Sequence, residues 1–269
     1  MPLEFLLGVY AALLGLIVGS YLNVVIYRLP RGISTVTPRS RCPECGAAIR
    51  AVDNVPVVSY LLLGGRCRDC RARISWRYPL LEAATSALFL ASFLRFGVSF
   101  EAPAAALLCA LLLTLAMIDF DHMILPDRIT LPGVAVGIAS QLVAPLAGLW
   151  PAVIGALVGA GILLAVWGLW LLVRREEGMG LGDVKMLALV GAFLGWPGVL
   201  VTLFFGALSG SIVGIALMRR GSVDMRSKLP FGVFLALGGL VALFFGDPLV
   251  EWYAGLLGLR AAWECAARC

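Results

Sequence analysis

Apolar stretches of membrane-spanning length recur along the chain, separated by short polar breaks. Windows without any charged residue cover residues 5–27, 102–118, 129–173, 186–218 and 229–246. A helix needs about 17–25 apolar residues to cross a bilayer. A further apolar stretch, residues 78–96, tolerates Glu82 and Arg95. The pattern therefore predicts membrane-spanning helices joined by short polar segments.

Two of these windows are long enough to hold two helices each. We expect residues 129–173 to break at Trp150-Pro151 and residues 186–218 to break at Trp196-Pro197-Gly198. The second window is short for two crossings, so its first helix should begin near Gly180. The predicted fold is an all-α polytopic membrane protein with about eight transmembrane helices.

Composition and charge agree with this class and set an orientation. Hydrophobic residues make up 61% of the chain, and charged residues 14%. Of the 21 Lys and Arg residues, 18 fall on one side of the eight-helix topology, which the positive-inside rule makes cytoplasmic. Both chain ends are then outside, and the first apolar stretch is predicted to be a retained helix because no basic run precedes it. The basic breaks lack interleaved aromatic residues, so we expect contact with lipid headgroups and no nucleic-acid partner.

The same pattern predicts four regions. Residues 1–30 form the first transmembrane helix, and residues 31–77 form a small cytoplasmic domain. Residues 78–247 form a transmembrane helical domain whose core covers about 102–218. Residues 248–269 form a C-terminal tail.

Four cysteines give the small domain a candidate metal site. Cys42 and Cys45 form one C-x2-C pair, and Cys67 and Cys70 form a second pair 21 residues later. Two such pairs are typical of thiolate knuckles that close a tetrahedral zinc site. A segment of this size buries too small a core to fold without a metal ion or disulfides. Cytoplasmic thiols stay reduced, which disfavours disulfides. The alternative is a redox C-x-x-C pair, although no thioredoxin-like βαβ unit surrounds it.

The remaining cysteines and two isolated polar residues are interpreted structurally. Cys109 is expected to be a small apolar residue within a helix. Cys265 and Cys269 could form a disulfide with each other on the outer side of the membrane, and the sequence leaves this open. His122 is interpreted as a loop histidine, and Asn23 as a polar group that joins two helices.

A glycine-rich break, residues 178–185, separates two charge-free windows and carries Asp183. A carboxylate costs about 2.5–3.5 kcal/mol at the centre of a membrane helix, which favours a chemical role for an acid in such surroundings. Gly180 and Gly182 place no side chain over it, so a substrate backbone could approach. The expected helix start puts Asp183 in a first turn, shallow and reachable, where the helix dipole favours an anion. The alternative is a flexible loop with a snorkelling Asp.

A second group of acids, Asp119, Asp121 and Asp127, follows the window 102–118 on the same expected side. One ionised and one protonated carboxylate could activate a water and protonate a peptide group. Chemistry alone does not choose among the three acids. No Ser–Lys dyad, triad or H-E-x-x-H motif is supported. The alternatives are an ion-coupled membrane transporter with paired membrane-edge carboxylates, or a structural membrane subunit with a zinc docking module.

The ordered combination of these motifs resembles the type IV prepilin peptidase family, the prepilin leader peptidase/N-methyltransferases of the G-x-G-D aspartic membrane peptidase class. The segments that carry the resemblance are residues 19–30, the four-cysteine domain with residues 53–56 and 74–79, Asp119 with residues 125–127, and residues 180–185. It extends over nearly the whole chain to about Met218.

The resemblance implies a membrane aspartic endopeptidase of the bacterial inner (cytoplasmic) membrane. Its substrates would be type IV prepilins and type II secretion pseudopilins, whose basic leader peptide is cleaved after a glycine at the cytoplasmic face. The implied catalytic pair is Asp119 and Asp183, with Asp119 chosen because it lies seven residues before Pro126. Gly180 and Gly182 would support the loop.

The resemblance also implies two cofactors. Structural Zn²⁺ would bind Cys42, Cys45, Cys67 and Cys70, and S-adenosylmethionine would serve N-methylation of the new amino terminus, at residues that the motifs do not map. Glu176, Glu177 and the acids around Asp121 either attract the basic leader or are solvated loop charges.

Overall fold

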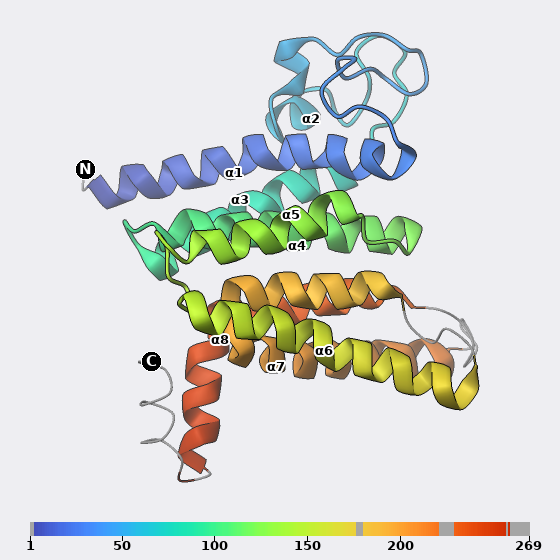
Figure 1. Ribbon diagram of the computed structural model, residues 1–269. Coiled ribbons are helices and arrows are strands. Elements are labelled where there is room, and N and C mark those ends of the chain that lie inside the picture. The colour runs from blue at the N-terminus through green and yellow to red at the C-terminus, as the bar shows by residue number, and fades with distance from the viewer. Residues whose placement is uncertain (1–2, 176–179, 221–228, 257, 259–269) are drawn as a thin grey trace. The chain divides into compact units, whose positions relative to one another are not determined.

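The computed structural model describes residues 3–175, 180–220, 229–256 and 258, and these residues form helices and loops with two isolated bridges (Figure 1). The helices are α1 (Leu3–Arg28), η1 (Leu29–Arg31), η2 (Ala51–Asn54), α2 (Val58–Leu62), α3 (Arg77–Phe96), α4 (Glu101–His122), α5 (Asp127–Ser140), α6 (Leu149–Arg174), α7 (Leu181–Arg219) and α8 (Phe231–Leu256). Contacts divide the chain into two compact units, Met1–Pro126 and Asp127–Cys269.

Among the described residues, six helices are long and apolar enough to cross a membrane: α1, α3, α4, α6, α7 and α8. Helix α7 is 39 residues long and is interrupted at Gly195, whose φ of 68° and ψ of −178° are not helical. The interruption directly precedes the expected break at Trp196. Helix α5 adds a further apolar segment of 14 residues. Dividing α7 at Gly195 and adding α5 gives eight segments, so the all-α polytopic fold with about eight helices is confirmed.

The break expected at Trp150-Pro151 was wrong, because these residues lie in the first turn of α6. Proline is tolerated there, since the first turn leaves its backbone N–H groups unbonded in any case. The chain breaks instead over residues 141–148, where Gln141 fixes the turn. Its amide donates to the Phe193 carbonyl of α7 at 3.1 Å and accepts from the Gly148 N–H at 3.1 Å.

In the Met1–Pro126 unit, α1 packs closely against α3, and α3 packs against α4. A Cβ on Gly15 would lie 2.6 Å from Ser86 Cα, and one on Gly19 would lie 2.8 Å from Glu82 Cα. The Asn23 side chain donates to the Tyr78 carbonyl at 3.2 Å, which confirms its role as a polar link between helices. Helix α4 carries most of the fully buried side chains of this unit: Leu108, Leu112, Leu115 and Ile118.

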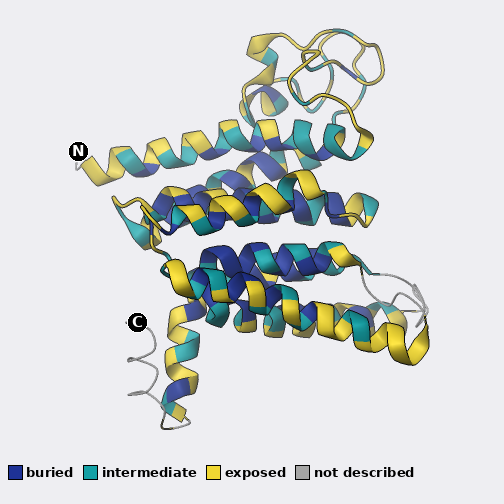
Figure 2. Cartoon of the chain, viewed as in Figure 1, coloured by how far each residue is buried: buried dark blue, intermediate teal, exposed yellow. Residues whose placement is uncertain are grey.

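In the Asp127–Cys269 unit, α5, α6 and α8 all pack on α7. Buried residues concentrate along the first half of α7 (Figure 2). Glycines allow the backbones of α6 and α8 to approach that of α7 closely. A Cβ on Gly191 would lie 2.2 Å from the Gly155 oxygen, and one on Gly238 would lie 2.2 Å from the Thr202 oxygen. Helix α8 continues through Pro248 to Leu256, into the segment predicted as a tail. Cys265 and Cys269 lie outside the described residues.

Candidate functional site

Asp183 occupies the first turn of α7, as the sequence predicted. Gly180 is the N-cap, with an extended conformation (φ −75°, ψ 140°), and its carbonyl accepts the Asp183 N–H at 3.2 Å. Of the residues that the structure describes, a Cβ at Gly180 would meet only the Gly182 nitrogen, at 3.9 Å. The Asp183 residue is 8% exposed, so it is more enclosed than the sequence suggested. The positive end of the α7 dipole favours a carboxylate at this position.

Asp119 lies in the last turn of α4, where its carbonyl accepts the Met123 N–H at 2.8 Å. Met123 ends the helix in a left-handed conformation with a φ of 52°. The Asp119 residue is 5% exposed. Asp119 therefore belongs to the Met1–Pro126 unit and Asp183 to the Asp127–Cys269 unit, and each is a buried acid at a helix end.

The other two acids of the second cluster are held in ion pairs within their own units. Arg77, the first residue of α3, donates to both Asp121 oxygens at 3.0 and 2.9 Å. Lys185 donates to Asp127 at 2.5 Å. These two partners satisfy the charges of Asp121 and Asp127, which favours structural roles for both. The interpretation of acids around Asp121 as attractors of a basic leader loses support, and Glu176 and Glu177 lie outside the described residues.

These ion pairs were missed by sequence reasoning, because 44 residues separate Arg77 from Asp121 and 58 separate Lys185 from Asp127. The one signal for these pairs in the sequence is that each joins two oppositely charged residues that lie next to the ends of apolar stretches. His122, interpreted as a loop histidine, ends α4 and has its Nε2 3.4 Å from an Arg31 nitrogen.

The four cysteines converge as predicted. The sulfur atoms of Cys42, Cys45, Cys67 and Cys70 all lie within 4.8 Å of one another, and those of Cys42 and Cys70 are 3.8 Å apart. With Zn–S bonds of about 2.3 Å, the edges of a tetrahedral S₄ site measure about 3.8 Å. Hydrogen bonds from the Cys45 and Glu44 backbones lower the Cys42 pKa to about 7. The donor set therefore fits a tetrahedral metal ion held by thiolates.

The two cysteine pairs form two equivalent turns that are offset by 25 residues. In the first, the Gly46 N–H bonds to the Cys42 carbonyl at 2.9 Å, and in the second the Arg71 N–H bonds to the Cys67 carbonyl at 3.1 Å. Both turns place the residue after the second cysteine at positive φ, 70° at Gly46 and 61° at Arg71. Isolated bridges, Arg41 to Ala48 and Arg66 to Arg73, close both turns in the same way.

An ion pair connects the second turn to η2. Arg68 donates to both Asp53 oxygens, with its Nε at 3.0 and 2.8 Å from them. The hydrogen bonds from Arg68 hold the pKa of the Asp53 carboxyl below its usual value. The pair therefore ties the segment between the two cysteine turns back to the second turn.

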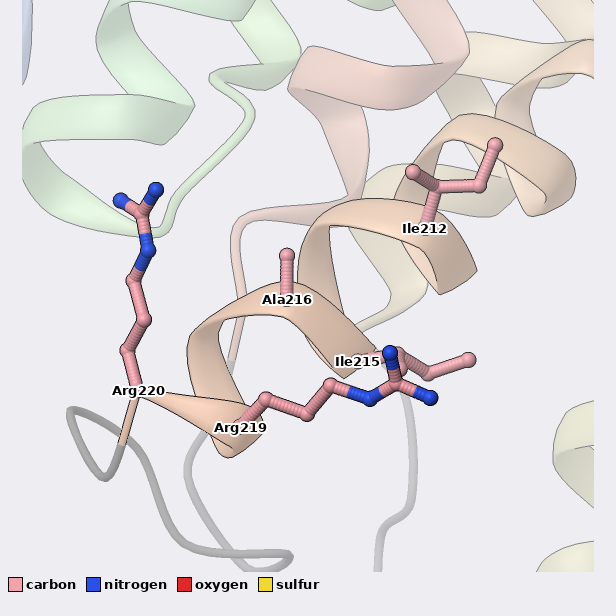
Figure 3. Close-up of a pocket in the computed structure, with 5 residues that line it drawn as sticks. All are labelled: Ile212, Ile215, Ala216, Arg219 and Arg220. Carbon is pink, nitrogen blue, oxygen red and sulfur yellow. The ribbon is translucent and has the colours of Figure 1, made fainter.

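The pocket in Figure 3, about 470 Å³ in volume, lies at the end of α7, and its lining includes neither candidate acid. It is lined by Ile212, Ile215, Ala216, Arg219 and Arg220, and the two arginines point in different directions (Figure 3). The lining offers no carboxylate, thiol or imidazole for acid–base or nucleophilic chemistry.

Comparison with known proteins agrees with the motifs. A model of the bacterial peptidase A24 N-terminal domain matches residues 13–96, and one of the type IV leader peptidase family matches residues 106–215. The chain is 43% identical to a prepilin leader peptidase/N-methyltransferase of Burkholderia pseudomallei strain 1026b, over 89% of this chain and 85% of the relative. It is 38% identical to proteins of the same name from Pseudomonas aeruginosa (96% and 97% covered) and Aeromonas hydrophila (90% and 91% covered). No solved structure matches the chain.

The matched ranges contain both candidate acids, the four cysteines and the glycines before Asp183. The relatives are similar to this chain over nearly its whole length, and their shared name agrees with the resemblance that the motifs carry. The chain belongs to the type IV leader peptidase family.

Proposed function

We propose that this protein is a membrane aspartic endopeptidase that cleaves the basic leader peptide from type IV prepilins and type II secretion pseudopilins at the cytoplasmic membrane face. Membership of a leader peptidase family supports this over the transporter alternative. The observation that carries the proposal is that Asp119 and Asp183 are buried acids at the ends of two apolar helices, both inside the range matched by the peptidase family.

In the proposed mechanism the two carboxylates act together on one water molecule. Asp183, at the positive end of the α7 dipole, is the ionised base, and Asp119, near the negative end of the α4 dipole, is the neutral acid. The base takes a proton from water as the water oxygen bonds to the scissile carbonyl carbon, and the acid protonates the carbonyl oxygen. Collapse of the tetrahedral intermediate breaks the C–N bond. The leaving nitrogen takes a proton from the carboxyl that received one, and a hydroxyl of the intermediate returns its proton to the Asp119 carboxylate, which restores both acids.

The proposed substrate suits the position of these acids. A pilin precursor is an apolar helix with a basic leader outside the bilayer, so its scissile bond lies near the membrane edge. Asp183 stands three residues from the Gly180 N-cap, and no side chain at Gly180 itself would block an extended peptide backbone. After cleavage, S-adenosylmethionine would donate a methyl group to the new amino terminus, as the name of the relatives suggests.

The test of the catalytic pair is cleavage of a purified pilin precursor by the detergent-solubilised protein. Asp119→Asn and Asp183→Asn nearly preserve shape but remove acid–base function, and loss of such help costs about 10²–10⁴-fold. The double variant should be little slower than either single one, because the pair acts as a unit. Methylation of a pre-cleaved pilin should survive in Asp183→Asn. Near-normal cleavage by either single variant would refute the pair.

The matched control is Asp121→Asn. An Asn at residue 121 still accepts one hydrogen bond from Arg77, so most activity should remain. If Asp121→Asn is inactive, Arg77→Ala decides the cause. Equal inactivity of Arg77→Ala would assign a positioning role to the ion pair, whereas an active Arg77→Ala would move the first catalytic position to Asp121.

We further propose that the four cysteines hold a structural zinc ion on the cytoplasmic side. Their sulfur separations suit tetrahedral thiolate ligation, and the surrounding segment is rich in arginine, which the positive-inside rule places in the cytoplasm. Cys42→Ser or Cys67→Ser should lower the zinc content and loosen residues 31–77, whereas Cys109→Ser should leave zinc unchanged. Elemental analysis that finds no zinc in the intact protein, with all four thiols reactive, would refute the assignment.

A further inference from the structure

The part of the four-cysteine domain that includes η2 and α2 exposes an apolar surface. Five aliphatic side chains of residues 52–62 are exposed, among them Leu61 at 70% and Leu62 at 82%; the others are Val52, Val55 and Val58. Most of α2 is accordingly drawn in the exposed colour in Figure 2. The stretch from residue 54 to residue 65 contains no charged side chain, although it lies between arginine-rich turns. An apolar surface of this kind marks a site of interaction.

One hydrogen bond places this segment beside the membrane helices and not beyond their ends. The Val57 N–H donates to a Glu82 oxygen at 2.7 Å. Glu82 is five residues past Arg77, the first residue of α3, which corresponds to about 7.5 Å along the helix axis. The Glu82 backbone also packs against Gly19, nine residues before the end of α1 at Arg28. Val57 is therefore anchored at a level where both helices are inside their apolar spans.

Seven backbone N–H groups between residues 57 and 65 are bonded within the protein, which lowers the cost of placing this stretch in lipid. The N–H groups of Val57, Val58, Ser59, Leu61, Leu63, Gly64 and Gly65 all donate to protein oxygens. Pro56 has no N–H, and the Ser59 hydroxyl donates to the Val52 carbonyl at 3.0 Å. Inside a bilayer each unsatisfied backbone group is costly, whereas a loop in water can bond to solvent.

Val57 itself has a conformation that needs external support. Its φ of 60° and ψ of −49° are unfavourable for a β-branched residue. Such conformations persist only where the surrounding structure fixes them, and here the Glu82 carboxyl accepts the Val57 N–H. Glu82 thereby sets the depth at which the segment meets the bundle.

We infer that residues 56–62 are embedded in the bilayer, in the leaflet that borders Arg28 and Arg77, and anchor the four-cysteine domain against the membrane through direct contact with phospholipid. The level of the Val57–Glu82 bond, on a helix long and apolar enough to cross a membrane, favours lipid as the occupant. Arg50 and Arg66, which are exposed and flank the segment, complement anionic headgroup phosphates.

The test is photo-crosslinking of the full chain in nanodiscs of phosphatidylethanolamine and phosphatidylglycerol, read by mass spectrometry. A photoreactive residue replaces Leu62, with Leu13 as the lipid-facing control on α1 and Glu44 as the exposed control in the first cysteine turn. Phospholipid adducts should be as abundant at position 62 as at position 13 and absent at position 44. The zinc content and the gel-filtration profile of each variant verify that it is folded. If the variant with the photoreactive residue at position 62 misfolds, the residue is placed at position 58.

Adducts at position 62 that contain only water, a second copy of the chain or an added pilin precursor would overturn the inference. Two further variants test the role of Glu82. Glu82→Ala removes the acceptor of the Val57 N–H and should reduce lipid adducts at position 62, whereas Glu82→Gln keeps an acceptor and should preserve them. Unchanged adducts in Glu82→Ala would refute Glu82 as the contact that sets the depth. The measurement needs no catalytic activity.

Discussion

The packing of α6 on α7 allows a strong test of the fold with a single methyl group. Gly191 of α7 faces Gly155 of α6, and a Cβ added at Gly191 would lie 2.2 Å from the Gly155 oxygen and 2.3 Å from its carbonyl carbon. Both contacts are to backbone atoms, so no side chain can rotate away. Gly191→Ala should therefore push the two helices apart, whereas alanine in open space would only strengthen a helix.

The expected cost follows from these distances. The favourable separation of non-bonded carbon and oxygen atoms is about 3.5 Å, so the two helices must move apart by about 1 Å to relieve the contact. A gap of 0.5–1 Å forfeits a quarter to a half of the dispersion attraction across an interface. Overpacking typically costs about 1–3 kcal/mol, and we expect Gly191→Ala to reach the upper part of that range because both sides are rigid. The gain in helix propensity offsets about 1 kcal/mol of it.

The assay is thermal unfolding of purified variants in one detergent, followed by circular dichroism. Gly161→Ala is the matched control, because Gly161 lies on α6 near Gly155 and a Cβ there would have no described residue within 4 Å. Gly161→Ala should leave the midpoint unchanged or raise it, and Gly191→Ala should lower it. Equal midpoints for Gly191→Ala and the unmodified chain would show that α6 and α7 do not meet at this point.

Three further outcomes are expected. In a double-mutant cycle, Lys185→Met and Asp127→Asn should show a coupling of at most about 1 kcal/mol in stability, since both side chains are partly exposed. Asp127→Asn should retain most precursor cleavage, because an Asn at residue 127 can still accept a hydrogen bond from Lys185. Because Arg68 lowers the Asp53 pKa, their ion pair should stabilise the four-cysteine domain fully above the ordinary Asp pKa of about 3.9. This stabilisation should be lost as the pH falls through the lowered pKa. The free energy of unfolding should therefore depend less on pH in Asp53→Asn. Arg71→Gly should slow zinc loss to a chelator, because a φ of 61° costs a non-glycine residue about 1–2 kcal/mol; faster loss would contradict this.

The sequence predicted those features that depend on local spacing. The glycine-rich break placed Asp183 in a first turn, and the two C-x2-C pairs indicated one four-sulfur cluster. Both follow from neighbouring residues and from elementary requirements of helices and thiolate ligation. The interruption of α7 at Gly195 likewise follows from the adjacent Trp196-Pro197-Gly198.

Features that depend on distant contacts were not accessible in this way. The break between α5 and α6 was misplaced at Trp150-Pro151, because a proline in a first turn does not interrupt a helix. The actual turn depends on Gln141, whose partner Phe193 lies 52 residues further along the chain. Charge and hydropathy alone cannot reveal such a bond.

The choice among acids near the end of α4 shows what the structure adds. Asp119 is followed two residues later by Asp121, which pairs with Arg77, and Asp183 is followed two residues later by Lys185, which pairs with Asp127. Two residues span about 200° around a helix, so each ion pair lies on the face opposite its buried acid. The paired side chains are partly exposed, 26% for Asp121 and 32% for Lys185. Each pair can therefore fix the rotation of its helix and hold the acid on the opposite, buried face, which is the placement that the proposed water-activating role of the two acids requires.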